Sequence, residues 1–235
     1  MRFDYSIPDT VRSIFNEPTQ VSPRRSRPVV VVTGGASGAG RACALALAKA
    51  GADLVLCDND TLGLQDVARL TGGFARFCDI ASETSVEIFA RDVIETFPKP
   101  RILVNAAGSD YVRALGMMRA SRSLLPALRK AEGRKMIVNV APGARLGPNR
   151  LFPNAASYDS FLRLSEAIAL QTRGSSVETA TIVPKRTRDF PSHDSLVPGS
   201  IGRVIEIDRL NPDAIAELVL DLARRAINPA ADRAA

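Results

Sequence analysis

Short apolar runs alternate with longer segments of helical periodicity from Val29 onward. A run that is apolar at nearly every position is typical of a strand buried on both faces, as in a parallel sheet covered by helices. The pattern predicts one doubly wound α/β domain of Rossmann type over residues 29–235, with a mostly parallel sheet of six or seven strands. The strands it predicts are Val29–Val32, Asp53–Cys57, Ala75–Cys78, Ile102–Asn105, Lys135–Val140 and Glu178–Val183.

Two segments depart from this regular alternation. Residues 1–28 are polar, punctuated by prolines, and predict a partly flexible extension. Residues 185–208 are rich in Pro, Ser, Arg and Asp and follow the end of a predicted strand, where ligands bind in doubly wound sheets, so they predict a mobile lid. Within that segment, Arg203–Asp208 fits either an edge strand or a loop. Asn211 and Pro212 then predict the start of the last helix.

The composition places the chain among globular proteins. It is 46% hydrophobic and 24% charged over 235 residues, which excludes disorder over most of its length. Its apolar runs are far shorter than the roughly 20 residues that a membrane helix requires. Arg2, Asp4 and Asp9 interrupt the N-terminus before a secretory signal could develop. We therefore expect a soluble, cytoplasmic protein without a membrane span.

The sequence lacks the usual ingredients of a metal centre or a hydrolase. Its three cysteines, Cys43, Cys57 and Cys78, lie among apolar neighbours without CxxC spacing, and we expect reduced core thiols and no metal. The single histidine, His193, falls in the predicted lid. No GxSxG elbow accompanies it, so histidine-based triad chemistry is disfavoured.

Most of the net charge of +6 comes from one segment, because residues 112–135 hold seven basic residues against one acidic residue. At about 100° per residue, Arg119, Arg122, Arg129 and Lys130 form one stripe of a helix, opposite a stripe of apolar residues (Met117, Leu124, Leu125 and Leu128). No aromatic residue interleaves with the basic stripe. We therefore expect a solvated helix face and no nucleic-acid partner.

The strongest motif is a glycine-rich turn between the first strand and a helix. Residues 33–40 read TGGASGAG, and the following helix, Arg41–Ala50, ends before Gly51. Such a turn brings backbone amides and the positive end of a helix dipole against a pyrophosphate. Asp58 closes the next strand, where a carboxylate can accept the ribose hydroxyls and repel a 2'-phosphate. The turn also lacks Lys and Arg, so we expect NAD, with NADP disfavoured.

These residues resemble the short-chain dehydrogenase/reductase family. The turn fits the family's TGxxxGxG pattern, Cys78-Asp79-Ile80 is similar to its adenine-contacting Asp with a following apolar residue, and residues 105–108 are similar to its NNAG motif. The resemblance covers about residues 29–227 and implies a nicotinamide dinucleotide as the partner. The residues expected to hold it are Gly34, Ala36, Ser37, Gly38, Ala39, Gly40, Asp58, Asp79, Ile80, Asn105, Ala106, Ala107, Gly108, Tyr158 and Pro184.

The resemblance also implies a catalytic set of tyrosine, lysine four residues later, serine and asparagine, and here that set is incomplete. Tyr158 matches the tyrosine, but Leu162 stands at the lysine position. The serine position falls on Ala141 or Pro142, and the asparagine position on Arg113. A phenol with a pKa near 10 needs a nearby cation to act as a base close to neutral pH, so the substitution at Leu162 bears directly on activity.

Three hypotheses follow. The first is an NAD(H)-binding protein of oxidoreductase descent in which hydride transfer to a carbonyl or from an alcohol is weak or lost. The second is a working NAD-dependent oxidoreductase on an unknown small molecule, with Tyr158 as acid or base and Arg113 as the substitute cation. The third is a non-catalytic interaction subunit. A homo-oligomer through the helices around Arg119 and Leu164 stays open in all three.

Overall fold

The computed structural model describes residues 27–97, 99–107, 111–141, 155–184, 202–207 and 211–227. They form a seven-stranded sheet in the order β3-β2-β1-β4-β5-β6-β7, with every neighbouring pair parallel. The strands are β1 (Val29–Thr33), β2 (Asp53–Asp58), β3 (Phe74–Phe77), β4 (Ile102–Asn105), β5 (Lys135–Val140), β6 (Val177–Pro184) and β7 (Arg203–Ile207).

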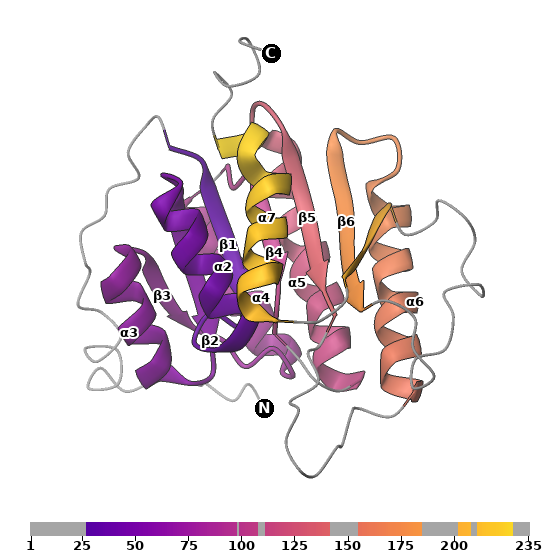
Figure 1. Ribbon diagram of the computed structural model, residues 1–235, viewed down its shortest axis with the longest axis horizontal. Coiled ribbons are helices and arrows are strands. Elements are labelled where there is room, and N and C mark those ends of the chain that lie inside the picture. The colour runs from indigo at the N-terminus through magenta and orange to yellow at the C-terminus, as the bar shows by residue number, and fades with distance from the viewer. Residues whose placement is uncertain are drawn as a thin grey trace, which may run out of the picture.

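Within the described ranges, six helices cover the two faces of the sheet (Figure 1). They are α2 (Gly38–Lys49), α3 (Thr61–Thr71), α4 (Glu83–Thr96), α5 (Tyr111–Lys130), α6 (Ala155–Thr172) and α7 (Pro212–Ile227). In Figure 1, α2, α3 and α7 lie in front of the sheet, and α4 and α5 lie behind it. The expected doubly wound α/β architecture is confirmed.

The two layers follow from the apolar strands. Along β1, Val29 and Val31 face a core cluster that holds residues of α4, α5 and α6, while Val30 and Val32 face a second cluster with α2 and α7. Successive strand residues point to opposite faces, so a strand covered on both sides is apolar at most of its positions. This explains why β1, β2, β4 and β5 are mostly apolar, with few buried polar residues such as Asn105 and Asn139.

The edge strand left open by the sequence is present. Residues 203–207 form β7, which pairs with β6 from Ala180↔Arg203 to Pro184↔Ile207. Ile205 and Ile207 pack against the cluster that includes α7, and this packing stabilises the short edge strand. The predicted lid was therefore wrong for these five positions, and the rest of 185–208, apart from Gly202, lies outside the described residues.

Other boundaries shift by a residue or two. The third strand is Phe74–Phe77, not Ala75–Cys78, because the chain turns at Asp79, whose carboxylate accepts a hydrogen bond from the amide of Ala81 at 3.1 Å. The last helix begins as expected, with the amide of Asp213 donating to Oδ1 of Asn211 at 2.9 Å. The extension at residues 1–28 lies outside the described residues up to residue 26.

The remaining expectations about burial are also met. All three cysteines are buried free thiols. On α5, the four apolar residues of the predicted stripe are buried, whereas Arg122, Arg129 and Lys130 are exposed and Arg119 pairs with Glu83 at 3.0 Å. Within the described ranges, no helix combines the length and apolar character needed to cross a membrane.

Candidate functional site

The glycine turn lies where β1 ends and α2 begins, at the carboxyl edge of the sheet. Gly34 has a φ of +71°, and a Cβ there would stand 2.7 Å from the backbone nitrogen of Ala107. A Cβ at Gly40 would stand 2.0 Å from the carbonyl oxygen of Gly34. Only glycine fits these two positions, because one needs a left-handed backbone and the other a close approach of two backbone segments. The turn is therefore tight against both α2 and the end of β4.

The N-terminus of α2 differs from its neighbours in having no side-chain cap. Asp60 accepts a hydrogen bond from the amide of Gly63 at the start of α3, and Ser82 does the same for Ser85 at the start of α4. Ser37 makes no such bond, and the first turn of α2 holds no acidic residue. First-turn amides of a helix need partners, and an anion can supply them. The turn thus fits the pyrophosphate of a dinucleotide.

Asp58 links the turn to the second strand. Its Oδ2 accepts from the amide of Ala36 at 3.1 Å, and its Oδ1 accepts from the amide of Asp60 at 3.1 Å. An ionised carboxylate can accept about four hydrogen bonds, so both oxygens of Asp58 can still accept a hydrogen bond from a hydroxyl group. The carboxylate is half-buried beside the turn, where it can accept the two hydroxyls of a ribose.

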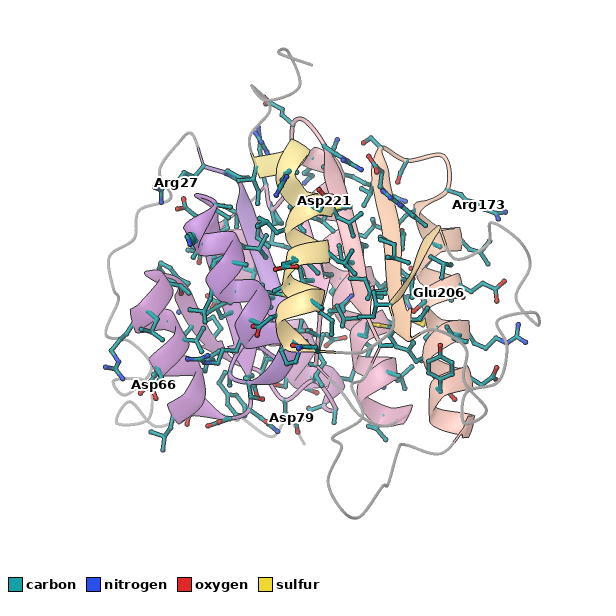
Figure 2. All side chains as sticks on the ribbon, in the orientation of Figure 1. Arg27, Asp66, Asp79, Arg173, Glu206 and Asp221 are labelled. Atoms are coloured by element: carbon teal, nitrogen blue, oxygen red, sulfur yellow. The ribbon has the colours of Figure 1, made fainter. Side chains whose placement is uncertain are left out.

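Asp79 and Ile80 follow β3 at the same edge. The amide of Asp79 donates to Oγ of Ser85 at 3.0 Å, which ties the segment to the first turn of α4. Ile80 is buried. In Figure 2, Asp79 lies at the lower edge, where the strands end, and Arg27 lies at the opposite edge beside the start of β1.

The segment after β4 completes the floor of this edge. The amide of Ala106 donates to the carbonyl of Thr33 at 3.3 Å, and the amide of Ala107 lies 3.4 Å from Oγ1 of Thr33. Asn105 is fully buried, and its Nδ2 donates to Oγ of Ser121 and to Oδ1 of Asn139, both at 2.9 Å. Asn105 thus ties the end of β4 to α5 and β5. Gly108 lies outside the described residues, and Pro184 is described only as the last residue of β6.

Tyr158 lies in the first turns of α6, with 1% of its surface exposed, and packs in the cluster that holds Leu162 and Val183. Burial raises the pKa of this phenol well above its ordinary value of 10.0, and the negative charge of Glu206 adds a smaller increase. Leu162, at the position of the family's lysine, is itself buried. The phenol is therefore held in its neutral form.

Glu206 lies in this region because β7 pairs with β6. It is paired with Val183 in the β6–β7 ladder. Ile205 and Ile207 pack toward α7, so alternation places Glu206 on the face of the sheet that α6 covers. Glu206 is not among the site residues predicted from the sequence. The alternation within RVIEI could have placed it on a face of a strand, but no local signal places that strand beside Tyr158.

The remaining catalytic positions are only partly described. Ala141, one of the two positions expected for the serine, is buried, and its amide donates to the carbonyl of Ile182 at 2.9 Å. Arg113 belongs to α5, but its side chain, like all of Pro142, lies outside what the structure describes. Among the described residues, no group of three or more His, Cys, Asp or Glu side chains gathers as a metal site.

Comparisons with known proteins identify the family of this chain. The sequence profile of short chain dehydrogenases matches residues 28–190. This chain belongs to the short-chain dehydrogenase family. It is 27% identical over 175 residues to an L-fucose dehydrogenase from Bos taurus, a match that covers 66% of this chain and 64% of the relative. The chain thus matches a little under two thirds of that relative's length.

Solved structures of the short-chain dehydrogenase family share the fold. A metagenomic short-chain oxidoreductase in complex with NADP is 25% identical, with a TM-score of 0.64 over 86% of this chain and 92% of the other. An alcohol dehydrogenase from the archaeon Thermococcus sibiricus, complexed with 5-hydroxy-NADP, is 22% identical, with a TM-score of 0.59 over 84% of this chain and 90% of the other. The similarity extends over most of the length of all three chains and shows a shared fold.

Proposed function

We propose that this short-chain dehydrogenase binds NAD(H) at the carboxyl edge of its sheet and that its hydride transfer on a carbonyl or alcohol is weak or lost. The uncapped start of α2 and the glycine turn would receive the pyrophosphate, and Asp58 the adenosine ribose. When bound, the nicotinamide would supply the hydride acceptor or donor. Asp79, Ile80 and residues 105–108 would line the rest of the cofactor site, with Tyr158 and Pro184 on the nicotinamide side.

Asp58 supports NAD over NADP. A 2'-phosphate on the ribose would stand next to this carboxylate and near Asp60, whose carboxylate caps α3. Two negative groups would repel the phosphate, and the turn itself supplies no cation, because residues 34–40 contain neither Lys nor Arg. The two neighbouring structures carry NADP-type cofactors, so the preference depends on these particular residues and needs its own measurement.

The environment of Tyr158 carries the proposal of weak or lost turnover. A phenol acts as a base near neutral pH only when a neighbour lowers its pKa. Here, burial and the charge of Glu206 both raise it. Leu162 offers a buried aliphatic side chain at the position where the family has its lysine, and Ala141 offers no hydroxyl to hold a substrate oxygen.

Binding and turnover can be tested separately. We expect NADH to bind, seen as a change in NADH fluorescence and a rise in Tm, while oxidation of NADH by a panel of ketones, quinones and acyl thioesters stays near background. No binding at millimolar NADH would overturn the cofactor assignment and favour an interaction subunit. Turnover at ordinary enzymatic rates would overturn the assignment of a weak site.

A double variant tests whether the missing cation and hydroxyl near Tyr158 are the reason for weak turnover. Ala141→Ser combined with Leu162→Lys introduces a hydroxyl at one of the two positions expected for the family's serine and a cation at the position of its lysine. We expect turnover to rise by at least about tenfold over wild type, the equivalent of about 1.4 kcal/mol of transition-state stabilisation. The same variant with Tyr158→Phe is the control and should remain inactive.

A working oxidoreductase is the second candidate, because a relative that matches 66% of this chain carries the name L-fucose dehydrogenase. In that case, L-fucose with NAD would be oxidised, Tyr158 would act as acid or base, and Arg113 would supply the positive charge. An arginine cannot readily give up a proton, but its charge can lower the pKa of a phenol. Activity that persists in both Tyr158→Phe and Arg113→Ala would exclude this arrangement.

A further inference from the structure

A row of buried polar side chains crosses the sheet below the proposed cofactor edge. Asn105, Asn139 and Thr181 are register partners on β4, β5 and β6, so they stand side by side on the same face. That face is the one covered by α5 and α6, and each residue is at most 1% exposed. Buried polar groups cost free energy unless they are hydrogen-bonded, so their partners need to be identified.

The asparagine pair leaves hydrogen-bonding capacity unused. Asn105 donates to Asn139 and Ser121, while Oδ1 of Asn105 and Nδ2 of Asn139 have no partner within the described part of the chain. Rotating both amides by 180° would reverse the bond between them. It would still leave one donor and one acceptor unpaired, so the choice of amide orientation does not remove the deficit.

Two buried hydroxyl groups, one on β6 and one on α6, also lack hydrogen-bond partners among the described residues. Oγ1 of Thr181 and Oγ of Ser165 are fully buried, and neither finds a partner among the residues that the structure describes. Other polar side chains on this face are paired: Oγ1 of Thr172 lies 2.9 Å from Oγ1 of Thr179, and Ser121 bonds to Asn105. The unpaired atoms of Asn105, Asn139, Thr181 and Ser165 thus all belong to the layer between the sheet and helices α5 and α6.

The Thr172–Thr179 contact fixes how far along β6 Ser165 lies. Ser165 lies two helical turns before Thr172, about 10.5 Å along α6 and on the same face. Thr181 and Val183 lie about 7 Å and 13 Å beyond Thr179 along β6. Helix α6 runs antiparallel to β6 and packs on it, so Ser165 lies over the stretch between Thr181 and Val183.

We propose that Asn139, Thr181 and Ser165 bind an ordered internal water molecule between the sheet and α6. Nδ2 of Asn139 offers donors, and the two hydroxyls can donate or accept, which matches the two to four hydrogen bonds that a buried water makes. The bound water would couple β5 and β6 to α6, the helix that carries Tyr158. This site is separate from the cofactor turn, and it stands whether or not the proposed function holds.

The sign of a stability change tests the proposal. Thr181→Val preserves the shape of the side chain and removes its hydroxyl. If the hydroxyl binds water, we expect the Tm to fall by about 2–4 °C, and Ser165→Ala to lower it similarly. If the hydroxyl is unpaired, removing it should leave the Tm unchanged or raise it, and that result would overturn the proposal.

A matched control and a coupling measurement sharpen this result. Thr179→Val removes a hydroxyl with a direct protein partner and should lower the Tm in either case, which calibrates the assay. If Ser165 and Thr181 share one water, the double variant should lose less Tm than the sum of the two single losses. A strictly additive double variant would contradict a shared water.

The wild-type protein supplies a measurement that does not depend on variants. We expect nuclear Overhauser transfer from a long-lived water to the side-chain amide protons of Asn139, or electron density for that water in a high-resolution crystal structure. Its absence from well-defined density around Asn139, Ser165 and Thr181 would overturn the site.

Discussion

The carboxylate of Asp58 accepts a hydrogen bond from the backbone amide of Ala36, 22 residues earlier in the chain, at 3.1 Å. The bond fixes the glycine turn to the end of β2, and it brings the groups proposed for the pyrophosphate and the ribose next to each other. Asp58 therefore shapes the turn as well as offering acceptors to a ribose.

Asp58→Asn should weaken NADH binding about ten- to a hundredfold, because hydrogen bonds to a charged group are worth roughly 1.5–3 kcal/mol. The affinity for NADPH should fall less or rise, since the charge that repels the 2'-phosphate is removed. Titration calorimetry with both nucleotides measures the two effects. Asp66→Asn, which changes an exposed carboxylate on α3, is the control, and an unaltered NADH/NADPH ratio in D58N would argue against the assigned specificity.

Alanine at two glycines of the turn should give different results. At Gly38, φ is +54° and a Cβ would meet no protein atom within 4 Å. Gly38→Ala should cost about 1–2 kcal/mol of folding stability from backbone strain and should abolish measurable NADH binding, because the methyl group would occupy the space proposed for the pyrophosphate.

Gly40→Ala should disrupt folding itself, because its methyl group would collide with the carbonyl of Gly34. Circular dichroism melting curves and NADH titrations on both variants distinguish the two outcomes. A well-folded Gly38→Ala protein with full NADH affinity would contradict the placement of the pyrophosphate.

The ionisation of Tyr158 should be visible directly, because the chain has only three tyrosines and no tryptophan. In a Tyr5→Phe/Tyr111→Phe background, the near-ultraviolet absorbance of tyrosinate should appear only well above pH 10, since burial and the charge of Glu206 raise the pKa. Glu206→Gln should lower that pKa, and Glu217→Gln on the exposed face of α7 should not. Titration near pH 10 or below in the Glu206-containing protein would refute the raised value.

The same shift makes a prediction about stability. The raised pKa favours the neutral phenol in the folded state, so its stabilising contribution is complete below pH 10 and is lost as pH rises through the folded pKa. Tyr158→Phe has no such group and should lose less Tm than wild type between about pH 8 and about pH 11. Equal losses would contradict the linkage.

The cysteines should be inert in the folded protein. Burial raises the pKa of the Cys43 thiol to about 12 and that of the Cys57 thiol well above its ordinary value, whereas a hydrogen bond with Cys57 lowers the pKa of Cys78. All three side chains are at most 2% exposed, so a reagent cannot reach even the Cys78 thiolate without local opening. A maleimide at pH 8 should therefore label none of them within minutes in the native state and all three in denaturant. Rapid labelling of one native thiol would show that its strand or helix opens locally.

The core and the glycine turn could be predicted because the information is local. Strand β1, the residues of the turn and the start of α2 follow one another directly, and an all-apolar strand next to a glycine turn has few alternatives. The first residues of α7 were predicted for the same reason, since Asn211 and Pro212 act within one helical turn. The apolar and basic stripes of α5 could be predicted from the helical period alone.

Contacts between segments far apart in the chain could not be predicted from the sequence. The strand Arg203–Ile207 could not be separated from a loop by its own residues, because its stability comes from pairing with β6 and packing near α7. The position of Glu206 near Tyr158 depends on that same pairing. No sequence spacing encodes it.

By itself, the sequence determined that the chain builds a covered parallel sheet with a glycine-rich turn after its first strand, and that Leu162, not a lysine, stands four residues after Tyr158. Only the tertiary structure decided that the negative charge of Glu206 acts on this phenol, and that Asn139, Thr181 and Ser165 belong to one buried layer between the sheet and α6. Periodicity and turn chemistry act over a few residues, whereas strand order and register bring together side chains that are far apart in the chain.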